Sequence, residues 1–170
     1  MKPELILLAL FVMKGSIGTA LAATTGTLTF QGLIQPGTCN LAAGDVNRTI
    51  ILDTVKVSDF DAVQSLAPKS FELTATCDSD VKNVTFTFSG TPVSGDSYRF
   101  VNTGKATGVS LWLQDSTPTT IRANGTDNRR TVTTVNGVAL MALRASYFKA
   151  DTVVTAGTFI STVTVNVTYN

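Results

Sequence analysis

A chain of 170 residues with a formal net charge of +1 is long enough for one domain with a real core, alone or behind a targeting segment. Residues 1–22 carry Lys2, Lys14 and Glu4, so the rest of the chain has equal numbers of basic and acidic side chains and no basic patch for nucleic acid or anionic lipid. Histidine is absent, which removes the commonest general base and the commonest transition-metal ligand. We therefore expect no enzyme, no cofactor and no metal site. Acid–base catalysis by a pair of carboxylates is the one catalytic mechanism that the composition still allows.

The first 22 residues have the pattern of a secretory signal peptide. Lys2 gives a positive start, residues 5–13 form an apolar run, and Ala20-Leu21-Ala22 supplies a cleavage site before Ala23. The run is too short to span a bilayer, and no other stretch of the chain is long or apolar enough. We predict an exported protein without an integral membrane span, with a membrane anchor as the alternative.

Residues 26–34 alternate in the manner of a β-strand and end at Pro36-Gly37. One row is apolar or small, and the other is more polar. Glycine at two positions of the apolar row weakens an isolated strand, which favours a segment that presses closely against another surface. An ordinary first strand, paired within its own domain, is the alternative. The apolar row consists of Gly26, Leu28, Phe30, Gly32 and Ile34.

Cys39 and Cys77 are the only cysteines, and they lie 38 residues apart. An exported protein functions in an oxidising compartment, where disulfides persist, and a zinc site would need more ligands than the chain offers. A disulfide between them is therefore expected, with two free buried thiols as the alternative.

The middle of the chain contains several short alternating segments separated by turn residues. Residues 58–68 have room for one short helical turn, and Asn124-Gly125 and Asn136-Gly137 suit tight hairpin turns. Trp112 lies on the outward row of its segment, where it either marks a contact surface or packs under a neighbouring loop. The predicted strands cover residues 49–57, 71–77, 84–88, 98–101, 109–114 and 139–148.

The chain ends in a long alternating strand that begins near Gly157 and closes with Tyr169 and Asn170. Its inward row is mainly apolar, and no later segment can pair along it. A long apolar strand at a sheet edge is an aggregation hazard that proteins normally cover. The inward row comprises Phe159, Ser161, Val163, Val165, Val167 and Tyr169.

Short strands at this spacing, with almost no helical periodicity, predict an all-β sandwich. Within that frame the sequence resembles the fimbrial subunits, or pilins, assembled by the chaperone–usher pathway, type 1 major subunits among them. The resemblance covers essentially all of residues 23–170, and four features in order carry it. They are the run Gly26-Thr27-Leu28-Thr29-Phe30-Gln31-Gly32, the cysteine spacing, the segment 143–148, and a terminus with Gly157 fourteenth from the end and Tyr169 next to last.

The resemblance implies an immunoglobulin-like sandwich that lacks its last strand and is completed by donor-strand complementation, a mode of strand addition between chains. It divides the chain into a signal peptide (1–22), a donor-strand extension (23–36) and a pilin domain (37–170). The donor positions are Thr24, Gly26, Leu28, Phe30 and Gly32. The groove and chaperone-binding positions are Gly157, Phe159, Val163, Val165, Val167, Tyr169 and Asn170.

The implied partners are copies of the chain itself, other fimbrial subunits, a periplasmic chaperone and an outer-membrane usher. The implied location is a cell-surface fimbria reached through the periplasm, where the filament supports adhesion. The outermost donor position falls at Thr24, or at Ala23 if the register slips, and both residues are small and weakly apolar. A minor adaptor or tip subunit, or an adhesin domain that binds a host glycan, is the alternative role.

Overall fold

The computed structural model describes residues 26–170, and it divides the chain into two units between Ile34 and Gln35. The predicted signal peptide and the donor position Thr24 lie outside the described residues. Residues 26–34 contain neither helix nor strand, so the strand predicted there is not formed in this structure. Every helix and strand of the described chain lies in residues 35–170, the body of the protein.

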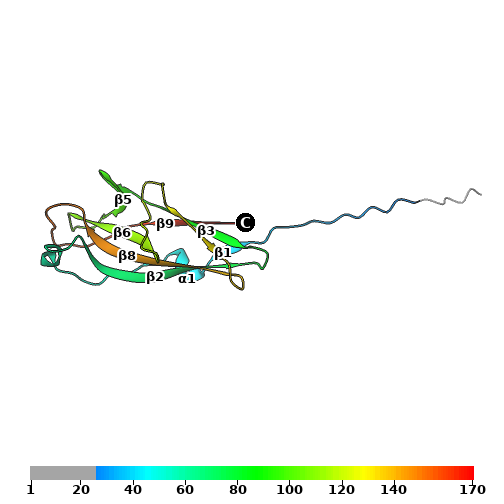
Figure 1. The fold of residues 1–170 in the computed structure, drawn as a ribbon, viewed down its shortest axis with the longest axis horizontal. Coiled ribbons are helices and arrows are strands. Elements are labelled where there is room, and N and C mark those ends of the chain that lie inside the picture. Colours follow the sequence, from blue (N-terminus) through cyan, green and yellow to red (C-terminus); the bar gives the residue numbers. More distant parts are fainter. Residues whose placement is uncertain (1–25) are drawn as a thin grey trace, which may run out of the picture. The chain divides into compact units, whose positions relative to one another are not determined.

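The larger of two antiparallel sheets has six strands in the order β1-β2-β8-β6-β5-β4 (Figure 1). Alternation places one row of each central strand against the core: Phe71, Leu73 and Ala75 in β2 pair across the ladder with Leu143, Met141 and Ala139 in β8. The strands are β1 (Cys39–Leu41), β2 (Ser65–Cys77), β4 (Pro92–Val93), β5 (Asp96–Val101), β6 (Val109–Asp115) and β8 (Val138–Lys149).

The smaller sheet has three strands in the order β7-β3-β9. These are β7 (Arg129–Thr133), β3 (Asn83–Ser89) and β9 (Thr164–Tyr169), and both ladders are antiparallel. Two single turns of helix, α1 (Ala43–Val46) and η1 (Val57–Phe60), lie in the connection between β1 and β2.

The core forms between the inward rows of the two sheets. Val84, Phe86 and Phe88 of β3 are completely or almost completely buried, and they belong to one cluster with Leu73, Leu111, Leu113, Met141 and Leu143 of the larger sheet. Two sheets that bury one apolar face each against the other form a β-sandwich, which confirms the predicted fold class.

Several local predictions are confirmed. The segments 71–77, 84–88, 98–101, 109–114 and 139–148 all lie within observed strands, and the helical turn expected after residue 57 is η1. Asn136 and Gly137 have φ values of 51° and 73° and form the two-residue turn between Val135 and Val138, which pair in an antiparallel bridge just before β8. Positive φ at both central residues is the geometry that suits a tight hairpin.

The strand predicted for residues 49–57 is wrong. No residue of this segment belongs to a ladder, and among the described residues none of the main-chain groups of 49–55 bonds to another main-chain group. The alternation is nevertheless visible in burial, because Ile50 and Leu52 are half-buried and Ile51 is exposed. Alternation of apolar and polar residues determines which side of the segment is buried. It does not provide the neighbouring strand that a ladder requires.

Two further expectations need correction. The final strand is shorter than predicted. Residues 157–163 are not paired with any strand, and β9 begins at Thr164. Gly125, with φ of 88°, turns the chain as expected, but Asn124-Gly125 does not join two paired strands and is no hairpin.

Trp112 packs within the protein instead of marking an exposed contact surface. Its Nε1 donates a hydrogen bond of 2.9 Å to Thr120 Oγ1, and its ring meets the Phe148 ring edge-on with centroids 5.7 Å apart. The Arg99 guanidinium lies 4.7 Å from the Trp112 ring centroid, a cation–π arrangement. Ser146, which lies opposite Trp112 in the ladder between β6 and β8, is buried on this same side of the sheet.

Candidate subunit interface

The outer edge of β9 is the feature on which the candidate site is built. Within the described residues β9 pairs only with β3, so its other edge makes no ladder. Unpaired main-chain groups on a strand edge are a template for another strand. We call the alternating residues Phe159, Ser161, Val163, Val165, Val167 and Tyr169 the acceptor row.

Main-chain hydrogen bonds show which residues present their N–H and C=O groups at this edge. Ile160 O accepts from Thr103 N at 2.7 Å, and ten residues later Asn170 N donates to Asn83 O at 3.3 Å. Main-chain groups alternate sides along a strand. Even-numbered residues therefore bond toward β3 and residues 102–106, and the odd-numbered acceptor row directs its main-chain groups at the unpaired edge.

The side chains of the acceptor row belong to the core but are incompletely covered. Phe159, Val163, Val165 and Val167 are half-buried and pack against the buried cluster. Tyr169, at the end of the row, is 41% exposed. The same residues thus offer both unused main-chain bonding groups and apolar surface, the two things that an added strand requires.

Residues 49–55 lie near the beginning of this row. The Phe159 ring meets the Tyr147 ring edge-on at 4.9 Å. Burial and, second to it, the negative charge of Asp53 raise the pKa of Tyr147. Asp53 Oδ1 also lies 3.1 Å from Lys69 Nζ of β2, the strand that pairs with β8 at Tyr147, and Leu52 and Phe159 both pack against the core cluster.

Gly157 and Asn170 limit the acceptor row at its two ends. A Cβ on Gly157 would lie 2.4 Å from Ala106 N, so only glycine fits where the chain passes residues 105–106. At the other end Lys82 N donates to Asn170 O at 3.2 Å. The segment is thus held within the body at both ends, by residues 105–106 at one and by Lys82 at the other.

The predicted donor residues lie in the other unit of the chain. Leu28 and Phe30 are 82% and 89% exposed, and Ile34 is exposed almost completely. Gly26 and Gly32 have open space around them, since a Cβ added at either would meet no atom within 4 Å. Exposed apolar surface of this kind is common where proteins contact other molecules.

The base of the extension is fixed by contacts that the sequence did not reveal. Gly37 N donates to Asp80 Oδ2 and Thr38 N donates to Asp78 Oδ2, both at 2.8 Å. Cys39 forms the expected disulfide with Cys77 directly beside them. The position of Asp78 and Asp80 just after the second cysteine was the one signal in the sequence for these contacts.

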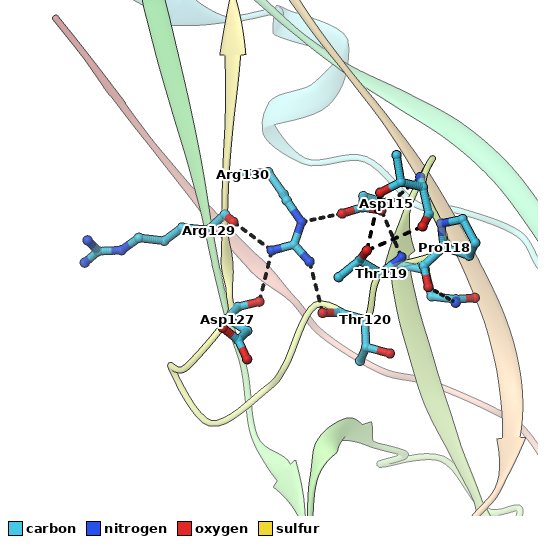
Figure 2. A network of polar contacts seen from close by, with 9 residues as sticks. Asp115, Pro118, Thr119, Thr120, Asp127, Arg129 and Arg130 are labelled. Carbon is cyan, nitrogen blue, oxygen red and sulfur yellow. Dashed lines mark hydrogen bonds and ion pairs between the residues drawn. The ribbon is translucent and has the colours of Figure 1, made fainter.

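The sequence also gave no indication of an ion pair between the two sheets. Arg130 of β7 donates through Nε to Asp115 Oδ2 at the end of β6, and its Nη2 donates to Thr120 O at 3.0 Å (Figure 2). Asp115 Oδ1 accepts from Thr117 N and Thr119 N, each at 3.0 Å. Burial alone would raise the pKa of Asp115, but the hydrogen bonds from Arg130, Thr117 and Thr119 and the charge of Arg130 lower it overall.

The described part of the chain contains neither a candidate metal site nor a candidate membrane span. Residues 26–170 contain no cluster of three or more carboxylate, thiol or imidazole side chains able to hold a metal ion. Within the same range, no helix is both long and apolar enough to cross a membrane.

Two antiparallel sheets around one core, with an unpaired edge at the last strand, define an immunoglobulin-like sandwich subunit. Comparison with known proteins agrees with this class. Residues 28–170 match the fimbrial protein family. The chain therefore belongs to that family, and it is a fimbrial subunit of the chaperone–usher type, exported through the periplasm to the cell surface.

Individual relatives lie within the same family. The type-1 fimbrial protein subunit of Serratia marcescens is 33% identical over 92% of this chain and 93% of its own length. The probable major fimbrial subunit LpfA of Escherichia coli O157:H7 is 28% identical over 96% of each chain. Among solved structures, the P pilus rod subunit PapA superimposes with a TM-score of 0.67 at 19% identity, covering 78% of this chain and 99% of PapA, which shows the shared fold.

Proposed function

We propose that this protein is a structural subunit that polymerises head to tail, each copy adding its N-terminal extension to the acceptor row of the next. The observation that carries the proposal is the acceptor row itself, which combines unpaired main-chain groups with half-buried apolar side chains on the same residues. The extension of another copy supplies the complementary features, namely a free main chain and the exposed side chains of Leu28 and Phe30.

Two energetic terms support this contact. Main-chain ladder bonds attach any extended strand, and alternate side chains that enter the core choose its register. Burial of Leu28 and Phe30 contributes roughly 1.5–3 kcal/mol each. The extension and the acceptor row are different surfaces of one subunit, so the contact repeats without closing and the product is a filament.

The same edge explains why assembly requires helper proteins. Until another subunit arrives, the acceptor row is an uncovered strand edge with an aggregation risk. A periplasmic chaperone covers it first, and exchange for the next subunit's extension takes place at an outer-membrane usher. The assembled filament supports cell adhesion.

The test is removal of residues 23–32. The truncated protein should still be recovered with its chaperone but should form no polymer. Polymers joined by strand addition should appear as a ladder in denaturing gels of unboiled samples and collapse on boiling. A normal ladder from the truncated protein would show that the donor segment is assigned wrongly.

A role as a minor adaptor or tip subunit is the second candidate. The minor fimbrial subunit HifD of Haemophilus influenzae is 31% identical over 87% of this chain, so family membership alone does not favour the shaft. A glycan array probed with the isolated subunit distinguishes an adhesin, which should bind a defined sugar, from a shaft subunit, which should bind none. We favour the shaft because one domain with one extension suffices for continuous polymerisation.

A further inference from the structure

Asparagine precedes glycine at two places in the sequence, Asn124-Gly125 and Asn136-Gly137. At such a dipeptide the main-chain nitrogen of the glycine can attack the side-chain amide carbon of the asparagine, because glycine has no Cβ to hinder the approach. Both asparagines are exposed, so access of water does not distinguish the two sites. They differ in how the main chain and the side chain are held.

Main-chain hydrogen bonds fix the peptide between Asn136 and Gly137. Val135 N donates to Val138 O at 2.8 Å and Val138 N donates to Val135 O at 3.0 Å, so a bonded pair closes the turn. Gly137 O accepts a further bond from Cys77 N at 2.7 Å. Attack on the Asn136 side chain would require this peptide to rotate and to give up these bonds, which disfavours the reaction at this site.

The peptide between Asn124 and Gly125 has no comparable restraint. Within residues 26–170, neither residue forms a main-chain hydrogen bond with another main-chain group. A Cβ added to Gly125 would meet no atom within 4 Å, so open space surrounds this residue. The nitrogen of Gly125 can therefore move toward the preceding side chain without breaking main-chain bonds.

The Asn124 side chain is held in a position that favours the attack. Its Oδ1 accepts hydrogen bonds from Thr126 N at 3.1 Å and from Thr126 Oγ1 at 2.8 Å. The first of these bonds closes an Asx-turn, which folds the side-chain amide over the Gly125 peptide. When the nitrogen of Gly125 bonds to Cγ, negative charge develops on Oδ1, and the two donors of Thr126 stabilise that charge.

We infer that Asn124 is a site of spontaneous deamidation that Thr126 assists through its two hydrogen bonds. Gly125 N loses its proton to hydroxide and forms a bond to Asn124 Cγ, after which the Cγ–Nδ2 bond breaks and Nδ2 takes up a proton and leaves as ammonia. The product is a cyclic imide. Water then opens one of its two C–N bonds, which gives aspartate if the new bond breaks and isoaspartate if the original main-chain bond breaks.

The modification changes the charge of an exposed loop. Residues 23–170 carry equal numbers of acidic and basic side chains, so each conversion adds one uncompensated negative charge. The new carboxylate arises in the loop 122–127, whose ends are joined by an ion pair of 3.3 Å between Arg122 Nε and Asp127 Oδ2. A population of exported subunits should therefore become more acidic with time.

Peptide mass spectrometry tests the inference. Exported protein, recovered with its chaperone, is kept in mildly alkaline buffer and cleaved with trypsin, which separates the two sites into peptides 123–129 and 131–144. Asn124 should deamidate at least about tenfold faster than Asn136, because only the reaction at Asn136 must break main-chain hydrogen bonds. In urea with reductant the two sites should react at similar rates. A rate at Asn136 equal to or above that at Asn124 in the folded protein would overturn the inference.

The part played by Thr126 needs a separate readout. Thr126→Val removes the hydroxyl donor and should slow deamidation of Asn124 roughly two- to tenfold in the folded protein, with no effect on the rate in urea. Thr133→Val, which alters an exposed threonine of β7, should change neither rate. Isoelectric focusing should show an acidic band that grows with time and is absent from Asn124→Gln. An unchanged rate in Thr126→Val, or equal slowing at Asn136, would contradict the assistance by Thr126.

Discussion

Arg130 and Asp115 join the two sheets of the sandwich through an ion pair in which the side chains are only 17% and 8% exposed (Figure 2). Arg130 lies on β7 of the smaller sheet, and Asp115 ends β6 of the larger one. Their remaining donors and acceptors are occupied by main-chain groups and by Thr117. Removing one partner of such a pair leaves an uncompensated buried charge and is strongly destabilising.

Replacing Arg130 by Met should therefore destabilise the protein by about 3–5 kcal/mol, because a nearly buried carboxylate loses its counter-charge. The matched control is Arg129→Met, whose side chain is exposed and makes no ion pair within residues 26–170. Urea unfolding followed by the fluorescence of the single tryptophan, Trp112, measures both. Equal midpoints for the two variants would contradict this view of the pair.

The same pair predicts how stability depends on pH. The pKa of Asp115 in the folded protein lies below its ordinary value of about 3.9. The resulting stabilisation is fully present above that value and is lost as the pH falls through the lower pKa of the folded state. Unfolding free energies measured between neutral and acid pH should therefore fall less steeply in Asp115→Asn than in the unchanged protein.

Loss of the disulfide should be costly. The bond between Cys39 and Cys77 closes a loop with a sequence separation of 38, for which loop entropy predicts about 4 kcal/mol of stabilisation. The double variant Cys39→Ser/Cys77→Ser should unfold at correspondingly lower urea concentration, and reducing agent should have the same effect on the unchanged protein. Insensitivity of the double variant to reductant is the internal control.

Gly37→Ala should weaken the base of the extension. An added Cβ would lie 2.0 Å from Asp80 Oδ1, so the carboxylate must turn away and release the Gly37 N–H, at a cost of about 1 kcal/mol. Asp80→Ala should cost a similar amount, and the double variant little more than either, which a double-mutant cycle measures. Gly44→Ala, with open space around it in α1, should be neutral or slightly stabilising.

A charge placed in the acceptor row should abolish its capture by the chaperone. Val165→Asp buries an unpaired carboxylate against the core, and Tyr169→Ala removes the last apolar side chain of the row. Both should lower the amount of subunit recovered from the periplasm. Asn166→Asp, which alters an exposed residue on the opposite face of β9, should leave recovery unchanged. Normal recovery of both row variants would argue against a role in capture.

The sandwich could be predicted from sequence because burial alternates locally. Phe71, Leu73 and Ala75 mark a buried face without knowledge of their neighbours, and the resemblance of the terminal segments indicated the family. The alternation of residues 49–57 is equally clear, yet the segment lacks a ladder because a strand also needs a partner along its edge. Pairing depends on the whole sheet and not on one segment alone.

Polar contacts between segments that lie far apart in the sequence could not be predicted from sequence patterns. Asp115 and Arg130 meet because β6 and β7 belong to different sheets that pack face to face. Gly37 meets Asp80 because the disulfide brings the two segments together.

The fastening of residues 37–39 has a mechanical consequence for a filament. A pull on the extension enters the body where two hydrogen bonds are backed by a covalent bond to Cys77, the last residue of β2. At 13 residues, β2 is the longest strand of the described chain and is anchored along most of its length to β8. Tension is thus delivered to the strongest part of the sandwich, and we expect a stretched fimbria to yield at the junctions between subunits before any single body tears open.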